Sequence, residues 1–106
     1  MSIEQRTLLD SVMKVERLKL LNALLENPDR YLSQLAEATH MDRGDVAYHI
    51  SILQQAGIAN PSYKRLREPK QEGNVPGEVV EIYPLNKKKM YEAVDLIKRL
   101  LPKTTD

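Results

Sequence analysis

Apolar residues recur at helical spacing along much of this chain, and turn-forming residues separate the stretches in which they do so. From Ile3 to Leu25 the apolar positions repeat every three or four residues without an intervening proline or glycine. This pattern predicts one bent helix or two, with a break near residues 14–16. The segment Asn27-Pro28-Asp29 ends the helical region, because proline disfavours the α conformation in the residue before it.

Two shorter helices are predicted next, over residues 33–38 and 43–56. The second helix carries one narrow apolar stripe, which consists of Val46, Ile50, Leu53 and Ala56. Gly57 supplies the left-handed residue that commonly follows a helix end. Ile58 can then fold back on Leu53, as a Schellman cap requires, so we expect the second helix to stop sharply.

The turn between these two helices is predicted at Thr39-His40-Met41. Asp42 follows the turn and is placed to cap the second helix by accepting a hydrogen bond from its free backbone N–H groups. Helix, short turn and capped helix is the helix-turn-helix plan, here over residues 33–56. A helix that is apolar on one side and short-chained and polar on the other can enter a DNA major groove. The pattern therefore favours residues 43–51 as a recognition helix.

The remainder of the chain predicts a β-hairpin and a last helix. The strands are expected at residues 62–67 and 78–85, joined by a loop rich in turn formers. Asn86 is placed to cap a helix over residues 87–101, which has a wide apolar stripe. The predicted fold is mainly α with a small β-hairpin, a winged helix-turn-helix. We expect one domain over residues 1–106, comprising the segments 1–25 (N-terminal helices), 33–56 (helix-turn-helix), 62–85 (wing hairpin) and 86–101 (C-terminal helix).

The amino-acid composition excludes several classes of function. The chain has 106 residues, no cysteine and only two histidines, so disulfides, thiolate zinc sites and cysteine nucleophiles are excluded and we expect no metal and no cofactor. No nucleophile–base pair or phosphate-binding loop is present, so an enzyme is not expected. Nothing resembles a signal peptide or a membrane span, which predicts a cytoplasmic protein. The formal net charge of +1 means that a DNA-binding surface would have to gather its cations on one face.

Several segments together resemble the ArsR-like family of transcriptional regulators. The match consists of the run from Arg17 to Leu24, then Leu35-Ala36-Glu37, then Val46 to Ile58, and finally Tyr83-Pro84-Leu85. The resemblance implies a winged helix-turn-helix fold and binding to double-stranded DNA. Metal-sensing members carry a cysteine pair in the helix before the turn. This chain has none there, so thiolate sensing is not carried over and no effector is implied.

The outer face of the predicted recognition helix supplies the candidate DNA contacts, which are Arg43, Gly44, Ala47, Tyr48 and Ser51. Each has an alternative. Arg43 can pair with a neighbouring aspartate, Gly44 can be a weak helix position, and Tyr48 can pack against its own hairpin. In the family pattern a histidine at His49 lies beside the buried stripe, so a structural hydrogen bond is expected there rather than base contact. Asp45 adds negative charge near the helix start, and no role is assigned to it.

The wing hairpin carries the basic candidates for DNA contact, Lys64, Arg65, Lys70 and Arg67. In an alternating strand Arg65 and Arg67 share one face, from which they can reach a minor groove or flanking phosphates. The alternative is a solvated charged hairpin.

The first and last helices carry more apolar surface than a small winged helix needs. In the resembling family these elements pair across a two-fold axis, which makes a homodimer the expected state. The candidate interface residues are Leu8, Val12, Val94, Ile97 and Leu101. The alternative is that both helices pack on each other within one chain.

These observations predict a homodimeric, sequence-specific regulator of transcription that binds double-stranded DNA. Two other functions remain open. Winged helices also serve as protein–protein interaction modules, which the near-neutral charge favours, and as architectural DNA binders without sequence preference.

Overall fold

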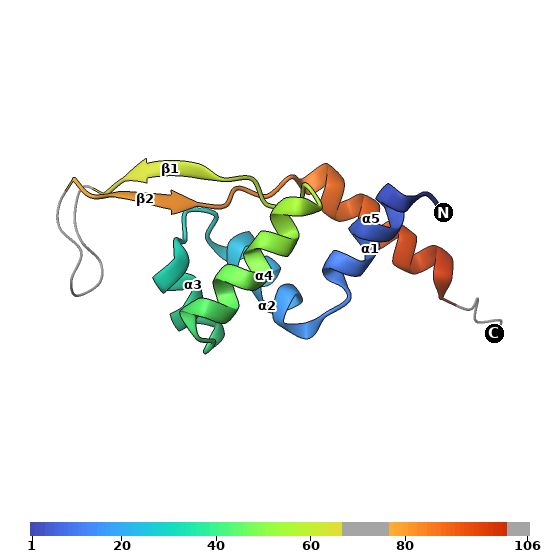
Figure 1. The fold of residues 1–106 in the computed structure, drawn as a ribbon, viewed down its shortest axis with the longest axis horizontal. Coiled ribbons are helices and arrows are strands. Elements are labelled where there is room, and N and C mark those ends of the chain that lie inside the picture. Colours follow the sequence, from blue (N-terminus) through green and yellow to red (C-terminus); the bar gives the residue numbers. More distant parts are fainter. Residues whose placement is uncertain (67–76, 102–106) are drawn as a thin grey trace.

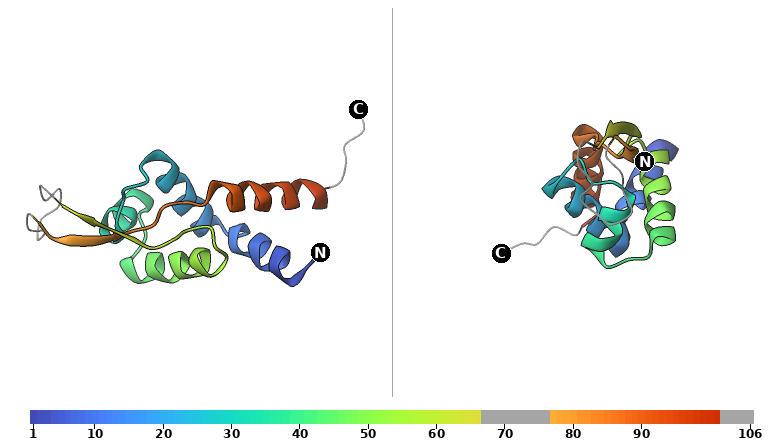
Figure 2. Two further views of the ribbon diagram at one scale, coloured as in Figure 1. Left: turned by 90° about the horizontal axis from the view of Figure 1, so that it is seen from above. Right: turned by 90° about the vertical axis from the view of Figure 1, so that its left-hand side faces the viewer.

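The computed structural model describes residues 1–66 and 77–101 and contains helices and one hairpin within them (Figure 1). In chain order the elements are α1 (Ile3–Val12), α2 (Val15–Glu26), α3 (Leu32–Thr39), α4 (Arg43–Gln55), β1 (Ser62–Arg65), β2 (Val79–Ile82) and α5 (Lys87–Leu100). Helices α2, α3 and α4 pack on one another, and α1 packs along α5. The hairpin lies at one end of the molecule, and the N-terminus and α5 lie toward the other (Figure 2). The predicted winged helix-turn-helix fold is therefore confirmed.

The N-terminal helical region consists of two helices, with the break at Met13 and Lys14. The first begins with a capping box, in which the backbone N–H of Gln5 donates to Ser2 Oγ at 3.1 Å and the backbone N–H of Ser2 donates to Gln5 Oε1 at 2.9 Å. Lys14 has an extended backbone, with φ −146° and ψ 135°, and this interrupts the helix. Of the two predicted alternatives, the structure has the broken helix.

Helix α4 ends as its sequence predicts. Gly57 has φ +79°, the Gly57 N–H donates to the carbonyl of Gln54 at 3.0 Å, and the Ile58 N–H donates to the carbonyl of Leu53 at 2.9 Å. These two bonds are those of a Schellman motif. The start of α4 differs from the prediction. Asp42 occupies the N-cap position, but its carboxylate makes no capping hydrogen bond, so that prediction was wrong about the side chain.

Gly57 offers a stability test of this helix end. We expect Gly57→Ala to lower the free energy of unfolding by about 1–2 kcal/mol, because a β-carbon disfavours the left-handed conformation. The added carbon would come no closer than 4.0 Å to the Lys89 side chain, so the cost is conformational rather than steric. Gly44→Ala is the matched control, and inside a helix it should raise stability by about 0.5–1 kcal/mol. Urea unfolding followed by circular dichroism measures both, and equal effects would contradict the assignment.

The hairpin is shorter than predicted. β1 and β2 pair antiparallel, with Ser62 opposite Ile82 and Arg65 opposite Val79. Within the described residues, β1 ends at Arg65, before the predicted Leu66, and the predicted strand 78–85 was too long at both ends. Pro84 has no backbone N–H to donate, and pairing resumes beyond it only as an isolated bridge between Ala59 and Leu85. Residues 67–76, including the loop and one end of the first predicted strand, lie outside the described residues.

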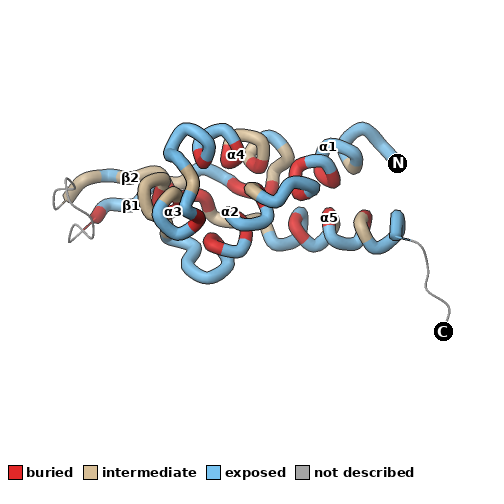
Figure 3. The backbone as a smooth tube through the Cα atoms, turned by 90° about the horizontal axis from the view of Figure 1, so that it is seen from below, coloured by how far each residue is buried: buried red, intermediate tan, exposed pale blue. Residues whose placement is uncertain are grey.

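The main core gathers apolar side chains from all the helices (Figure 3). Leu20, Leu24, Leu35, Val46, Leu53 and Ile58 are its large side chains with the least exposure. A second, smaller cluster under the hairpin consists of Tyr31, Leu66 and Ile82. In the described part of the chain, none of the helices has both the length and the apolar character needed to cross a bilayer.

Two predicted dimer residues belong to this core. Leu8 and Val12 are each only 3% exposed, because α1 lays them against the chain's own core. They cannot offer apolar area to a second copy, so their assignment to a dimer interface was wrong. Val94 and Leu101 are exposed, and Ile97 is half-buried. The alternative of packing within one chain holds for the inner faces of α1 and α5, and the outer face of α5 stays available.

Candidate nucleic-acid interface

The outer face of α4 is exposed along its first turns. Arg43, Gly44, Ala47 and Tyr48 are all exposed, whereas Val46 on the opposite face is fully buried. The buried stripe of Val46, Ile50 and Leu53 fixes the rotation of the helix, because a turn about its axis would bring polar groups into the core. The structure thus brings the predicted contact residues together on one accessible, firmly held face.

The remaining α4 residues lie in different environments. Ser51 is half-buried, and its hydroxyl donates to the backbone carbonyl of Tyr48 at 2.6 Å. Because the proton is used within the helix, the hydroxyl oxygen can only accept a hydrogen bond from a group outside it. A β-carbon at Gly44 would meet nothing within 4 Å. Packing within the chain therefore does not require glycine there. Tyr48 projects from α4, and its ring meets the His49 ring edge-on, with centroids 5.0 Å apart.

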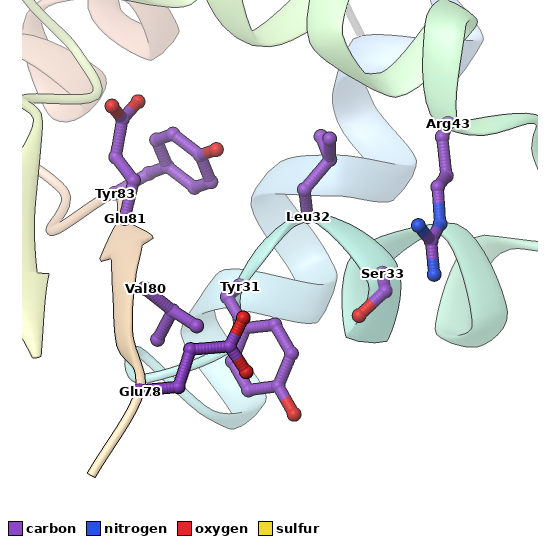
Figure 4. A pocket seen from close by; sticks show the side chains of 8 residues that line it. All are labelled: Tyr31, Leu32, Ser33, Arg43, Glu78, Val80, Glu81 and Tyr83. Carbon is purple, nitrogen blue, oxygen red and sulfur yellow. The ribbon is translucent and has the colours of Figure 1, made fainter. Parts of the chain in front are cut away.

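Arg43 reaches a surface pocket that the sequence did not indicate. The pocket has a volume of about 320 Å³ and lies between the start of α3, the start of α4 and strand β2 (Figure 4). Its lining residues are Tyr31, Leu32, Ser33, Arg43, Glu78, Val80, Glu81 and Tyr83. Burial raises the pKa of the Tyr83 hydroxyl, and the carboxylate of Glu81 adds to that effect. The pocket thus lies between the start of α4 and the β2 side of the hairpin.

Two carboxylates in this pocket restrict the kind of ligand that it can bind. Glu78 Oε2, just before β2, is buried and has no hydrogen-bond partner among the described residues, and Glu81 of β2 also lines the pocket. Two carboxylates opposite Arg43 disfavour a bound phosphate inside the pocket. Sequence reasoning treated Glu78 only as the start of a strand, and no local pattern distinguishes it from an ordinary surface glutamate.

The basic residues of the wing are partly engaged within the chain. Lys64 Nζ lies 2.8 Å from Asp29 Oδ2 in an exposed ion pair, so its charge is largely offset. Arg65 Nη1 donates to the carbonyl of Gly77 at 3.0 Å and links the two strands at the loop end of the hairpin. Arg65 remains exposed, with further N–H groups to offer. Arg67 and Lys70, the other two candidates, lie outside the described residues.

His49 does not belong to the exposed face. It is buried, and its Nδ1 lies 3.0 Å from Arg17 Nη1, so the expected structural hydrogen bond is present. Burial, followed by the nearby Arg17 guanidinium, lowers the pKa of His49. Among residues 1–66 and 77–101, no three histidine or carboxylate side chains come together as ligands for a metal ion.

The order of elements, the exposed second helix of the helix-turn-helix and the adjoining hairpin define a winged helix-turn-helix protein. Residues 14–60 match the family described as bacterial regulatory protein, arsR family. Residues 14–60 thus form an arsR-family helix-turn-helix domain, the DNA-binding part of a family of transcriptional regulators that are not enzymes. The predicted resemblance and the prediction of a non-enzymatic protein are confirmed by this match.

Solved structures support the fold. A homodimeric winged helix-turn-helix DNA-binding domain from Mycobacterium bovis, a possible ArsR-family transcriptional regulator, matches with a TM-score of 0.63 and 14% identity, over 97% of this chain and 86% of that one. A possible transcriptional regulator from Methanosarcina mazei matches with a TM-score of 0.56 and 17% identity, over 84% and 71%. The PcaV regulator of Streptomyces coelicolor, with its natural ligand, matches with a TM-score of 0.54 and 20% identity, over 83% and 55%. No curated protein sequence matches this chain.

Proposed function

We propose that this chain is a homodimer that binds specific sequences of double-stranded DNA. Each protomer, acting as one DNA-binding domain, places residues 43–51 in a major groove. The observation that carries this proposal is the exposed, short-chained outer face of α4, held in place by the buried stripe on its other side. Arg65 stands at the loop end of the wing hairpin, where it can reach flanking phosphates. Transcription is then regulated by occupation of a promoter.

The homodimer rests on two supports. The structurally similar domain from Mycobacterium bovis is homodimeric. In this chain the outer face of α5 carries exposed apolar side chains at helical spacing, namely Tyr91, Val94 and Leu101. Symmetric dimers are the commonest oligomers, and a two-fold axis would present two α4 helices to half-sites about 34–36 Å apart.

Selection from a randomised duplex library by the purified protein tests the proposed function. Enrichment of an inverted repeat with half-sites about one helical turn apart is the expected result. Binding without a consensus, lost at physiological salt, would instead identify an architectural DNA binder. Absence of duplex binding at low salt would point to a protein–protein interaction module and contradict the proposal.

A substitution on α5 tests the dimer separately. We expect Val94→Glu to weaken dimerisation at least about tenfold, because each two-fold interface would then bury two unpaired carboxylates. Arg99→Glu is the control, since it places the same side chain at an exposed position in the last turn of the same helix. Sedimentation equilibrium measures the dissociation constant of each variant. A monomeric wild-type protein, or equal constants for the wild type and Val94→Glu, would refute this interface.

A further inference from the structure

A buried cation lies at the junction of α1, α2 and α4. The Arg17 side chain on α2 belongs to a residue only 8% exposed, and no carboxylate forms an ion pair with it in the described part of the chain. Its Nε donates to the carbonyl of Ser11 at 2.5 Å, and its Nη2 donates to the carbonyl of Asp10 at 3.2 Å. Both carbonyls stand at the C-terminal end of α1, where the helix dipole favours a cation. Arg17 thus anchors the end of α1.

The third partner of Arg17 comes from the recognition helix. His49 is 6% exposed, and its Nδ1 lies 3.0 Å from Arg17 Nη1. A guanidinium can only donate, so Nδ1 must accept this bond and carry no proton. The His49 ring is therefore neutral, with its proton on Nε2. One side chain of α2 in this way holds both the end of α1 and the inner face of α4.

We propose that Arg17 and neutral His49 are positioning residues for DNA recognition, and that protonation of His49 releases α4 and weakens DNA binding. This inference rests on the proposed function. The connection to the DNA-facing side is short, because the Tyr48 ring meets the His49 ring edge-on with centroids 5.0 Å apart. A displacement of His49 therefore reaches an exposed residue of the candidate interface directly.

Protonation would break the contact for a chemical reason. Protonated His49 carries an N–H on both ring nitrogens, so a donor and a positive charge would face the Arg17 donor in a buried site. The charged groups around His49 are the cations Arg17 and Lys14 and the carboxylates Glu16 and Asp45. The carboxylates oppose the effect of the cations, but burial and Arg17 outweigh them, and the pKa of His49 is lowered.

The sign of the pH dependence follows from that direction. A histidine whose pKa is lower in the folded chain than in the unfolded chain binds fewer protons when folded. Its contribution to stability is therefore complete above the unfolded pKa of about 6.5 and is lost as the pH falls through the folded pKa. Acid is expected to loosen α4, and alkali has no corresponding effect through this group.

The decisive comparison is between the wild type and His49→Asn. The asparagine amide oxygen lies where Nδ1 lies in histidine, so it can accept the Arg17 bond but cannot titrate. We expect both proteins to bind the selected duplex within about threefold of each other near pH 7.5. The wild type should lose about three- to tenfold in affinity between about pH 7.5 and 5.5, because one proton with a pKa below about 6.5 can contribute no more than that. His49→Asn should lose less than about threefold over the same range. Fluorescence anisotropy at constant ionic strength measures these affinities.

A second variant tests the anchoring. Arg17→Lys keeps the positive charge, but a single ammonium group cannot reach all three acceptors of the guanidinium. We expect this variant to bind the selected duplex at least about tenfold more weakly near pH 7.5. Circular dichroism should show that it remains folded. Equal pH profiles for the wild type and His49→Asn would overturn the role of protonation. Wild-type affinity in folded Arg17→Lys would overturn the anchoring. If Arg17→Lys does not fold, the His49→Asn comparison alone decides.

A measurement without DNA separates this inference from the proposed function. Hydrogen exchange reports the opening of α4 in the free protein. After correction for intrinsic rates, the α4 amides of the wild type should lose protection near pH 5.5, and those of His49→Asn should keep it. If no duplex is selected but this difference is found, the proposed function fails while the release of α4 stands. Equal protection in both proteins would overturn the release itself.

Discussion

Replacing Leu53 by alanine is expected to lower the free energy of unfolding by about 2–5 kcal/mol. Leu53 is 0% exposed and lies on the inner stripe of α4, where it packs in the main core. Truncation to alanine removes buried methyl groups and leaves a cavity that the surrounding helices can only partly close. Because domains of this kind are stable by only about 5–15 kcal/mol, the loss is a large fraction of the total. Urea unfolding at fixed protein concentration gives the value.

The matched control is Leu18→Ala. Leu18 is also a helical leucine, on α2, but it is 50% exposed. Its truncation removes little area from the interior, so we expect a loss below about 1 kcal/mol. Comparable losses for the two variants would mean that the inner stripe of α4 does not anchor the fold. The rotation of the candidate interface would then lack its physical basis.

The recognition helix could be predicted because its determinants are local. The stripe of Val46, Ile50 and Leu53 sets its inner face, and Gly57 with Ile58 sets its end, all within a few turns of chain. The Asn86 cap of α5 was predictable for the same reason, and the Lys89 backbone N–H donates to Asn86 Oδ1 at 3.2 Å. Asp42 shows the limit of such reasoning. It stands at the correct position, but nothing in a sequence fixes which way a capping side chain turns.

Features that depend on distant partners could not be predicted. An apolar stripe indicates that a helix face is buried, but it does not indicate which surface packs against that face. Leu8 and Val12 pack in the chain's own core. The Arg17–His49 contact joins residues 32 positions apart, and no periodicity connects them. The pocket beside Arg43 arises where three elements meet, so Glu78 and Tyr31 carry no local sign of it. In each case the missing information is tertiary packing rather than local propensity.

Arg43→Ala is expected to weaken binding to the selected duplex by about 10–100-fold. Arg43 lies in the first turn of α4 and is exposed, and no ion pair within the described residues engages its guanidinium. A guanidinium at the start of a recognition helix can donate two parallel hydrogen bonds to a guanine edge or bind a phosphate. Fluorescence anisotropy against the selected duplex, at several salt concentrations, measures the loss.

The salt dependence and the sequence dependence separate the two kinds of contact. If Arg43 reads a base, Arg43→Ala relaxes discrimination at one position of the half-site, because the lost hydrogen bonds were specific to that base pair. If it binds a phosphate, affinity falls uniformly across sequences and the salt slope decreases by about 1. Arg99→Ala in the last turn of α5 removes the same charge away from α4 and should change affinity by less than about threefold. Wild-type affinity in Arg43→Ala would show that the start of α4 does not face DNA, and the candidate interface would have to be sought on another surface of the chain.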